Sequence, residues 1–236
     1  MLELADVVDC FLTALYPRRC ALCGKVIVPA AYMCKDCEET VPRVLPPVCI
    51  LCGRGKDECL CKNFRFYYSG LVAPFYYEGA VRRCIHQFKF YGKTQHARML
   101  GKAMADTVIR EFAGKEFDFI TGVPLTKKSL KSRGFNQSDL LANEVGKALE
   151  IKPVHNLLAK IYDTPAQHTM NSSMRRGNLA GVFDVVNPSL IKNKTILICD
   201  DVATTGSTIN ECSKMLLLSG AAEVYCVTAA VTGKTS

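Results

Sequence analysis

Two adjacent carboxylates and a run of hydroxyl side chains follow an apolar stretch in the last part of the chain. Asp200 and Asp201 come directly after the apolar residues 196–199, and residues 203–208 read Ala-Thr-Thr-Gly-Ser-Thr. The hydroxyl groups can donate hydrogen bonds to a phosphate, and Gly206 lets the backbone approach it closely. The carboxylates would repel a phosphate, so we expect them to bind sugar hydroxyls or water around a divalent cation. The pattern therefore predicts a sugar-phosphate site.

The same segment is a predicted strand-to-helix turn. Residues 196–199 have the composition of a buried strand, and residues 209–218 carry apolar side chains at helical spacing. At the carboxyl end of a parallel strand, the following helix offers unpaired backbone N–H groups and a partial positive charge to an anion. The alternative is a strand end with an ordinary helix cap, but a cap requires one Ser or Thr and not the whole run.

Residues 196–208 resemble the phosphoribosyl diphosphate (PRPP) signature of type I phosphoribosyltransferases, in which apolar residues lead into Asp-Asp and then Thr-Thr-Gly-x-Thr. By that resemblance, Asp200 and Asp201 would bind the ribose 2′- and 3′-hydroxyls and belong to the catalytic residues. The 5′-phosphate would be held by the six residues Ala203, Thr204, Thr205, Gly206, Ser207 and Thr208.

Three other polar segments are candidates for the same site. Lys127 and Lys128 lie in a predicted loop after a second strand, where two cations suit a pyrophosphate and its developing charge. Arg133 is a candidate PRPP contact at the start of a helix predicted to run to about residue 149, and a plain surface charge is the alternative. Residues 164–178 are predicted to form a mobile flap that excludes water, with an ordinary polar loop as the alternative. The candidates in and near the flap are Lys160, Gln167, Arg175 and Arg176.

Eight of the thirteen cysteines fall between residues 20 and 61, where the pattern Cys-x-x-Cys-Gly occurs twice. Four thiolates at such spacing form a closed tetrahedral zinc site, and a segment this short and rich in proline needs metal to fold. Pairing in sequence order is the simplest assignment, and an interleaved arrangement is the alternative. The sequence therefore predicts two structural Zn²⁺ sites, one with Cys20, Cys23, Cys34 and Cys37 and one with Cys49, Cys52, Cys59 and Cys61.

The chain of 236 residues has a formal net charge of +8, most of it after residue 66. Two zinc ions bound by eight thiolates would halve that charge, which weakens a nucleic-acid interpretation. Much of the excess positive charge can instead attract a polyanionic small molecule. The cysteine-rich part also carries cations and aromatic rings that either contact single-stranded nucleic acid or are solvated surface and packing against the second domain. They are Arg18, Arg19, Lys25, Arg54, Lys56, Lys62 and Arg65 with Phe64, Phe66, Tyr67 and Tyr68.

Strand and helix patterns alternate after the cysteine-rich part. Strands are predicted near residues 71–77, 117–123, 181–186, 195–199 and 223–231, and helices near residues 79–90, 95–112, 133–149 and 209–218. This alternation predicts an α/β fold with a mainly parallel sheet flanked by helices. We expect two domains, a zinc-ribbon module with an amino-terminal helix over residues 1–66 and a phosphoribosyltransferase-like domain over residues 67–236.

The chain resembles the ComF family in five features. Three are the cysteine module, the PRPP loop and the flap that ends in residues 175–178, and two are the short segments 88–92 (Phe-Lys-Phe-Tyr-Gly) and 133–137 (Arg-Gly-Phe-Asn-Gln). The resemblance covers nearly the whole chain. It implies a double zinc ribbon, a type I phosphoribosyltransferase domain that binds PRPP with Mg²⁺, and a role in natural competence. The partners it implies are PRPP, imported single-stranded DNA and a protein of the DNA-uptake machinery. Lys160 and Tyr162 stand where relatives often carry arginine, and lysine lacks arginine's bidentate grip on phosphate.

Two other functions are consistent with these residues: a free-standing nucleobase or nucleotide phosphoribosyltransferase, and a PRPP-sensing regulator without catalysis. The carboxylates do not separate these hypotheses, because binding and catalysis use the same loop. His86, His96 and His168 are candidates for a general base by residue type alone. Residues 1–15 lack the pattern of a secretory signal and no stretch has the length of a membrane span. We therefore expect a cytoplasmic protein that attaches to the membrane, if at all, through a partner.

Overall fold

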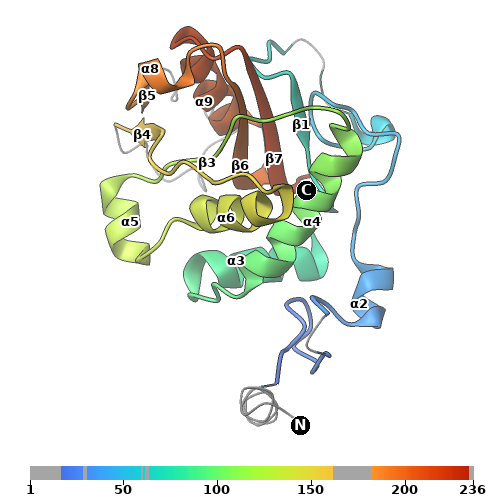
Figure 1. Cartoon of the computed structure of the whole chain (residues 1–236). Helices are drawn as coiled ribbons and strands as arrows, with labels where there is room; N and C mark the ends of the chain where they lie inside the picture. Colours follow the sequence, from blue (N-terminus) through green and yellow to red (C-terminus); the bar gives the residue numbers. More distant parts are fainter. Residues whose placement is uncertain (1–16, 29–30, 60, 62–63, 162–181, 234–236) are drawn as a thin grey trace, which may run out of the picture.

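The core of the fold is a sheet of five strands. Their bounds are β1 Gly70–Val72, β2 Phe75–Tyr76, β3 Phe119–Gly122, β6 Thr195–Ala203 and β7 Glu223–Val231. The computed structural model describes residues 17–28, 31–59, 61, 64–161 and 182–233, and Figure 1 shows their course. The strand order is β1-β7-β6-β3, β2 also pairs with β7, and every pairing in this sheet is parallel. The predicted mainly parallel sheet is confirmed.

Helices cover both faces of this sheet (Figure 1). They are α3 (Gly79–Phe90), α4 (His96–Glu111), α6 (Gln137–Leu149) and α9 (Ser207–Leu218). In β6, Leu197 and Cys199 belong to the apolar cluster formed with α3, α4 and α6, whereas Ile196 and Ile198 belong to the cluster formed with α9. Side chains of a strand point alternately to opposite faces, so one continuous apolar run supplies both cores.

The remaining elements are short. They are α2 (Lys35–Thr40), the 3₁₀ helix η1 (Lys56–Glu58), α5 (Lys127–Arg133), β4 (Leu158–Lys160), β5 (Phe183–Val185) and α8 (Pro188–Ile191). β4 and β5 form a separate antiparallel pair, and β5 contacts α9. Within the described ranges, no helix is both long enough and apolar enough to cross a membrane.

The cysteine-rich segment contacts the α/β part at several places, of which two show how its halves pack. Leu22 belongs to the same apolar cluster as Met99 and Leu100 of α4. Farther along the chain, the Ile50 carbonyl accepts a hydrogen bond of 2.7 Å from the backbone N–H of Leu71 in β1. The two halves of the cysteine-rich segment therefore pack on different parts of the α/β structure.

Strand β6 is longer than the sequence predicted. It does not end at residue 199 but continues through Asp200 and Asp201 to Ala203. The reason is its neighbour β7, which is equally long and pairs with β6 as far as Ala203 and Val231. Hydrogen bonds to a partner strand override the low strand propensity of aspartate. The two carboxylates therefore sit in the strand and not in the turn that follows it.

Lys127 and Lys128 begin helix α5, so the prediction that they lie in a loop was wrong. Thr126 caps this helix, because its Oγ1 accepts a hydrogen bond of 3.1 Å from the backbone N–H of Ser129. The polar sequence of α5 shows little apolar periodicity, which is why its pattern did not predict a helix.

The sequence analysis predicted that Arg133 starts the next helix, but this residue is the last one of α5. Gly134 follows it with φ of 80°, in the left-handed region that glycine adopts at low cost. Asn136 then caps α6 by accepting a hydrogen bond of 3.1 Å from the backbone N–H of Ser138. One predicted loop and helix are therefore two helices joined by a tight turn.

Candidate functional site

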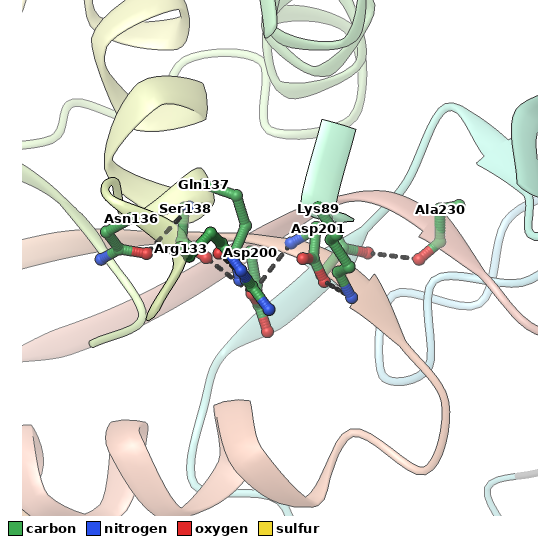
Figure 2. A network of polar contacts seen from close by, with 9 residues as sticks. Lys89, Arg133, Asn136, Gln137, Ser138, Asp200, Asp201 and Ala230 are labelled. Atoms are coloured by element: carbon green, nitrogen blue, oxygen red, sulfur yellow. Dashed lines mark hydrogen bonds and ion pairs between the residues drawn. The ribbon is translucent and has the colours of Figure 1, made fainter. Parts of the chain in front are cut away.

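Asp200 and Asp201 lie near the carboxyl end of β6, beneath α3 and α6 (Figure 2). Their exposed fractions are 8% and 3%. Burying two adjacent carboxylates is unfavourable unless each gains hydrogen bonds or a counter-charge. The partners of the two side chains therefore determine what this site can bind.

Asp200 accepts two hydrogen bonds at Oδ1. The Ser138 hydroxyl donates one at 2.8 Å, and the backbone N–H of Asp201 donates the other at 2.9 Å. Burial, and after it the neighbouring Asp201 charge, raise the pKa of Asp200 to about 7. Asp200 therefore changes its charge near neutral pH, and its ionised form is the better acceptor for sugar hydroxyls.

Asp201 forms an ion pair with Lys89 of α3, with 2.8 Å between Oδ1 and Nζ (Figure 2). Burial alone would lower the pKa of Lys89, but the Asp201 carboxylate outweighs burial and holds that pKa above its usual value. The second oxygen, Oδ2, is buried and has no hydrogen-bond partner in the described part of the chain. Such an oxygen is ready to accept a ligand hydroxyl, a water molecule or a cation.

Sequence reasoning assigned Lys89 no role. It placed this residue near the end of the helix predicted at residues 79–90 and in the segment 88–92 that resembles the ComF family, with nothing to show that the helix would end over β6. The signal that could have found it is the ComF-like segment 88–92, in which Lys89 is the only cation.

The residues after β6 form the turn into α9. Gly206 has φ of 72° and is the N-cap of this helix of 12 residues. Thr205 Oγ1 and Ser207 Oγ lie 2.7 Å apart, so hydroxyl groups gather at the first turn of α9. The unpaired N–H groups of that turn carry partial positive charge. This arrangement is typical of an anion site.

A cavity of about 380 Å³ joins residues 203–208, which we call the phosphate loop after their predicted ligand, to the carboxylates. The predicted residues that line it are Asp200, Asp201, Ala203, Thr204, Thr205, Gly206, Ser207, Thr208 and Lys160. Arg82, Lys89 and Gln137 also line it, and the sequence analysis had assigned none of them a role. The structure thus gathers two carboxylates, a hydroxyl-rich turn and three cations around one space.

Two other predicted cations, Lys127 and Lys128, are not on the wall of this cavity. Lys127 and Lys128 are exposed in the first turn of α5 and are not among the lining residues. The flap candidates Gln167, Arg175 and Arg176 lie outside the described residues. The roles of all five side chains stay predictions.

Arg133 stands behind the cavity wall. Its guanidinium donates a hydrogen bond to Gln137 Oε1 and lies 5.4 Å from the centre of the Phe90 ring. Burial lowers the pKa of Arg133, and the charges of Asp201 and Asp200 offset part of that effect. Arg133 is therefore half-buried and supports a lining residue, in contrast to the alternative of a plain surface charge.

Two of the three candidate histidines lie in the described structure, in different surroundings. His96 is buried, with Nδ1 lying 3.4 Å from Cys84 Sγ and 3.3 Å from the Cys84 carbonyl oxygen. His86 is exposed on α3, and His168 lies outside the described residues. Neither His86 nor His96 lines the cavity between β6 and α9.

The eight cysteines form two groups of four in sequence order, as predicted. Within each group the sulfur atoms all lie within 4.8 Å of one another, with 3.5 Å between Cys23 and Cys34 and 3.6 Å between Cys49 and Cys61. Tetrahedral Zn–S bonds of about 2.3 Å place sulfurs about 3.8 Å apart. The thiolates therefore fit zinc, and four cysteine ligands leave no open coordination position for chemistry.

Two domain families match the chain, the double zinc ribbon domain over residues 11–65 and the phosphoribosyl transferase domain over residues 99–235. "DNA utilization protein YhgH" of Salmonella typhimurium is 30% identical over 213 residues, which cover 88% of each chain. "Competence protein F" of Haemophilus influenzae is 29% identical over 87% of this chain and 93% of its own. "Competence protein ComFC" of Bacillus subtilis is 23% identical over 84% of this chain and 82% of its own. The similarity spans both the cysteine-rich part and the α/β part.

Proposed function

This chain belongs to the ComF family, in which a double zinc ribbon precedes a phosphoribosyl transferase domain, and from that premise we propose that it binds PRPP with Mg²⁺. We also propose that the protein acts in the cytoplasm on imported single-stranded DNA during natural competence. The names of the relatives, two competence proteins and a DNA utilization protein, support this role. The observation that carries the PRPP proposal is the distribution of charge in the cavity between β6 and α9.

The two ends of the cavity suit the two ends of a ribose 5-phosphate. Thr204 to Thr208 and the start of α9 attract an anion, whereas Asp200 and Asp201 accept hydrogen bonds and would repel an anion. We therefore assign the 5′-phosphate to the loop and the ribose hydroxyls to the carboxylates. Arg82 and Lys160, which also line the cavity, are the proposed contacts of the diphosphate.

The carboxylates also suit a divalent cation. Asp201 Oδ2 is buried and unpaired within the described structure, and carboxylate oxygens are preferred ligands of Mg²⁺. We propose that Asp200 and Asp201 hold Mg²⁺, directly or through water. When bound, the ion would neutralise charge that develops on the diphosphate.

The exposed face of α3 is the proposed contact for single-stranded DNA. A groove of about 450 Å³ is lined by Arg82, Arg83, His86, Gln87, Tyr91 and Lys93. The rings of Phe90 and Tyr91 are 52% and 70% exposed. Cations beside exposed rings favour single strands, since phosphates contact the cations and bases stack on the rings.

The aromatic residues of the cysteine-rich part are less suitable for stacking on bases. Tyr68 is only 6% exposed, and Phe66 packs against the apolar cluster beneath α9. Tyr68 and Phe66 therefore pack against the α/β part, as in the second of the two interpretations of this segment. Phe64, at 41% exposed, is the most accessible ring of the three.

Isothermal calorimetry of the zinc-loaded protein tests the PRPP proposal. We expect binding of PRPP in the presence of Mg²⁺, and loss of that binding in Asp200→Asn/Asp201→Asn. Asp106→Asn, which removes an exposed carboxylate on α4, is the matched control and should bind as the wild type does. Absence of heat with the wild-type protein would refute PRPP as the ligand.

Fluorescence anisotropy with a labelled single-stranded oligonucleotide tests the DNA proposal. Arg83→Ala/Lys93→Ala should weaken binding and reduce the steepness of log K against log salt by about 1.4, since each phosphate contact on a single strand contributes about 0.7. The control, Lys102→Ala/Arg110→Ala, removes the same charge from α4. Equal weakening in both variants would show that net charge, and not the α3 face, attracts the strand.

A further inference from the structure

The two zinc knuckles carry a basic residue at the same place, directly after Cys-x-x-Cys-Gly. It is Lys25 in the first knuckle and Arg54 in the second. Lys25 is on the surface, where its side chain is 65% exposed and pairs with Asp36 at 2.5 Å. Arg54 is 6% exposed. Equivalent positions in the repeat therefore have different surroundings, and Arg54 requires a separate explanation.

Arg54 reaches out of the zinc ribbon to the ends of β6 and β7. Its Nη2 donates a hydrogen bond of 2.7 Å to the Thr204 carbonyl, and its Nε donates one of 2.6 Å to the Thr232 carbonyl. Nη2 also lies 3.2 Å from Thr232 Oγ1, which itself donates to the Thr204 carbonyl at 3.2 Å. Arg54 is thus joined to Thr204, the first hydroxyl residue of the phosphate loop.

The backbone of Arg54 is fixed by the turn that presents the second set of cysteines. The Arg54 carbonyl accepts a hydrogen bond of 2.7 Å from the N–H of Cys49, and Gly53 N–H donates to the Cys49 carbonyl at 2.8 Å. Cys49 and Cys52 both belong to the second metal group. A metal that holds these two sulfurs therefore also holds the residue whose side chain reaches the phosphate loop.

The contact with Thr204 determines where the next N–H group points. The peptide bond is planar and trans, so the carbonyl of Thr204 and the N–H of Thr205 point in opposite directions. Because Arg54 holds the carbonyl on the side of the zinc ribbon, the Thr205 N–H points away from the ribbon. Thr204, Thr205 and Gly206 line both the PRPP cavity and a smaller cavity beside Arg54, so this stretch forms the wall between them.

We propose that Arg54 is a positioning residue that transmits the metal state of the second Cys₄ site to the phosphate loop. Zinc at Cys49, Cys52, Cys59 and Cys61 then favours the loop conformation that binds phosphate. By linkage, a ligand on the loop strengthens retention of that zinc. The first Cys₄ site lacks this connection, since Lys25 points to Asp36 and solvent. The identity of the ligand rests on the proposed PRPP function, whereas the ordering of the loop does not.

Hydrogen exchange without ligand tests the connection directly. Cys61→Ser and Cys23→Ser each remove one ligand and should each reduce bound zinc by one ion per chain. We expect faster amide exchange at residues 204–207 in Cys61→Ser and in Arg54→Gln, and unchanged exchange there in Cys23→Ser and Lys25→Gln. Unchanged amides of α4 would show that the domain stays folded. Equal loop protection in all four variants would overturn the proposal.

Ligand titration supplies the second measurement. Arg54→Gln should bind PRPP about tenfold to hundredfold more weakly than the wild type, as for the loss of hydrogen bonds from a charged donor, and Lys25→Gln should bind normally. Arg54→Lys should recover little, because one ammonium lacks the fork that spans both carbonyls. Tight binding by Arg54→Gln would refute the positioning role. Absence of binding by the wild type would refute PRPP as the ligand, and the exchange experiment would still decide the role of Arg54.

Discussion

Lys89 and Asp201 form an ion pair of 2.8 Å on the wall of the cavity, with side chains 23% and 5% exposed. The ammonium group supplies the positive charge that a buried carboxylate requires before any cation binds. A divalent ion bound to Asp201 would therefore share the carboxylate with Lys89 or displace it. This pair links helix α3 to strand β6 and leads to the first prediction.

Lys89→Met should destabilise the fold by about 3 kcal/mol at pH 7.5, because it leaves Asp201 buried without its counter-charge. Urea denaturation followed by circular dichroism would measure the change in the free energy of unfolding. Lys102→Met is the control, since Lys102 and Asp106 form an exposed pair on α4 whose loss should change stability by less than about 0.5 kcal/mol. Similar losses in both variants would contradict the importance of burial.

The stability of the protein should fall between about pH 5 and pH 8 through Asp200. Burial raises the pKa of Asp200 to about 7 in the folded state, well above its value in an unfolded chain. The folded state therefore binds more protons than the unfolded state in this range, and its stability is lost as pH rises through about 7. The contribution is on the order of 2 kcal/mol, or about 5 °C in melting temperature.

Asp200→Asn provides the comparison that isolates this effect. Its melting temperature should exceed that of the wild type at pH 8 by more than at pH 6, since asparagine carries no buried charge. Asp118→Asn should not show this pattern, because the Lys194 hydrogen bond lowers the pKa of Asp118. Parallel curves of melting temperature against pH for wild type and Asp200→Asn would be evidence against a raised pKa.

Gly206→Ala should weaken PRPP binding and reduce stability by about 1 kcal/mol, because φ of 72° is strained for alanine. The added methyl group has room, as its nearest neighbour is the Tyr68 hydroxyl at 3.6 Å. Gly114→Ala is the matched control, with φ of 77°, open space and a position far along the chain from the loop. Calorimetry should show a loss of affinity for PRPP in Gly206→Ala and not in Gly114→Ala. Chemical denaturation should show similar losses of stability in both variants.

Elemental analysis should find two zinc ions per chain. Removing them with a chelator should unfold residues 20–61, because the described part of this segment has few buried apolar residues besides those that pack on α4 and β1. Limited proteolysis would locate the cleavage sites within that segment. A content of one zinc or none would refute two complete sites.

The strand-loop-helix segment was predictable because its evidence is contiguous in the chain. Residues 196–208 combine an apolar run, two carboxylates and a hydroxyl-rich turn with one glycine, and each of these features follows from local spacing. The pairing of the cysteines was predictable for the same reason. Lys127 and Lys128 show the limit of local evidence, because a short polar helix and a polar loop have similar composition.

Only the tertiary structure decided which distant residues support the site. Ser138 lies 62 residues from Asp200, and Arg54 lies 150 residues from Thr204, yet both form hydrogen bonds with these partners. Lys89 meets Asp201 because α3 packs across the sheet on β6. Packing of elements sets these contacts, and neither the spacing nor the types of the residues contain that information. The sequence by itself therefore determined the fold class, the segment that resembles a PRPP signature and the cysteine ligands. Packing determined the charge partners of these residues and the contact between the zinc ribbon and the phosphate loop.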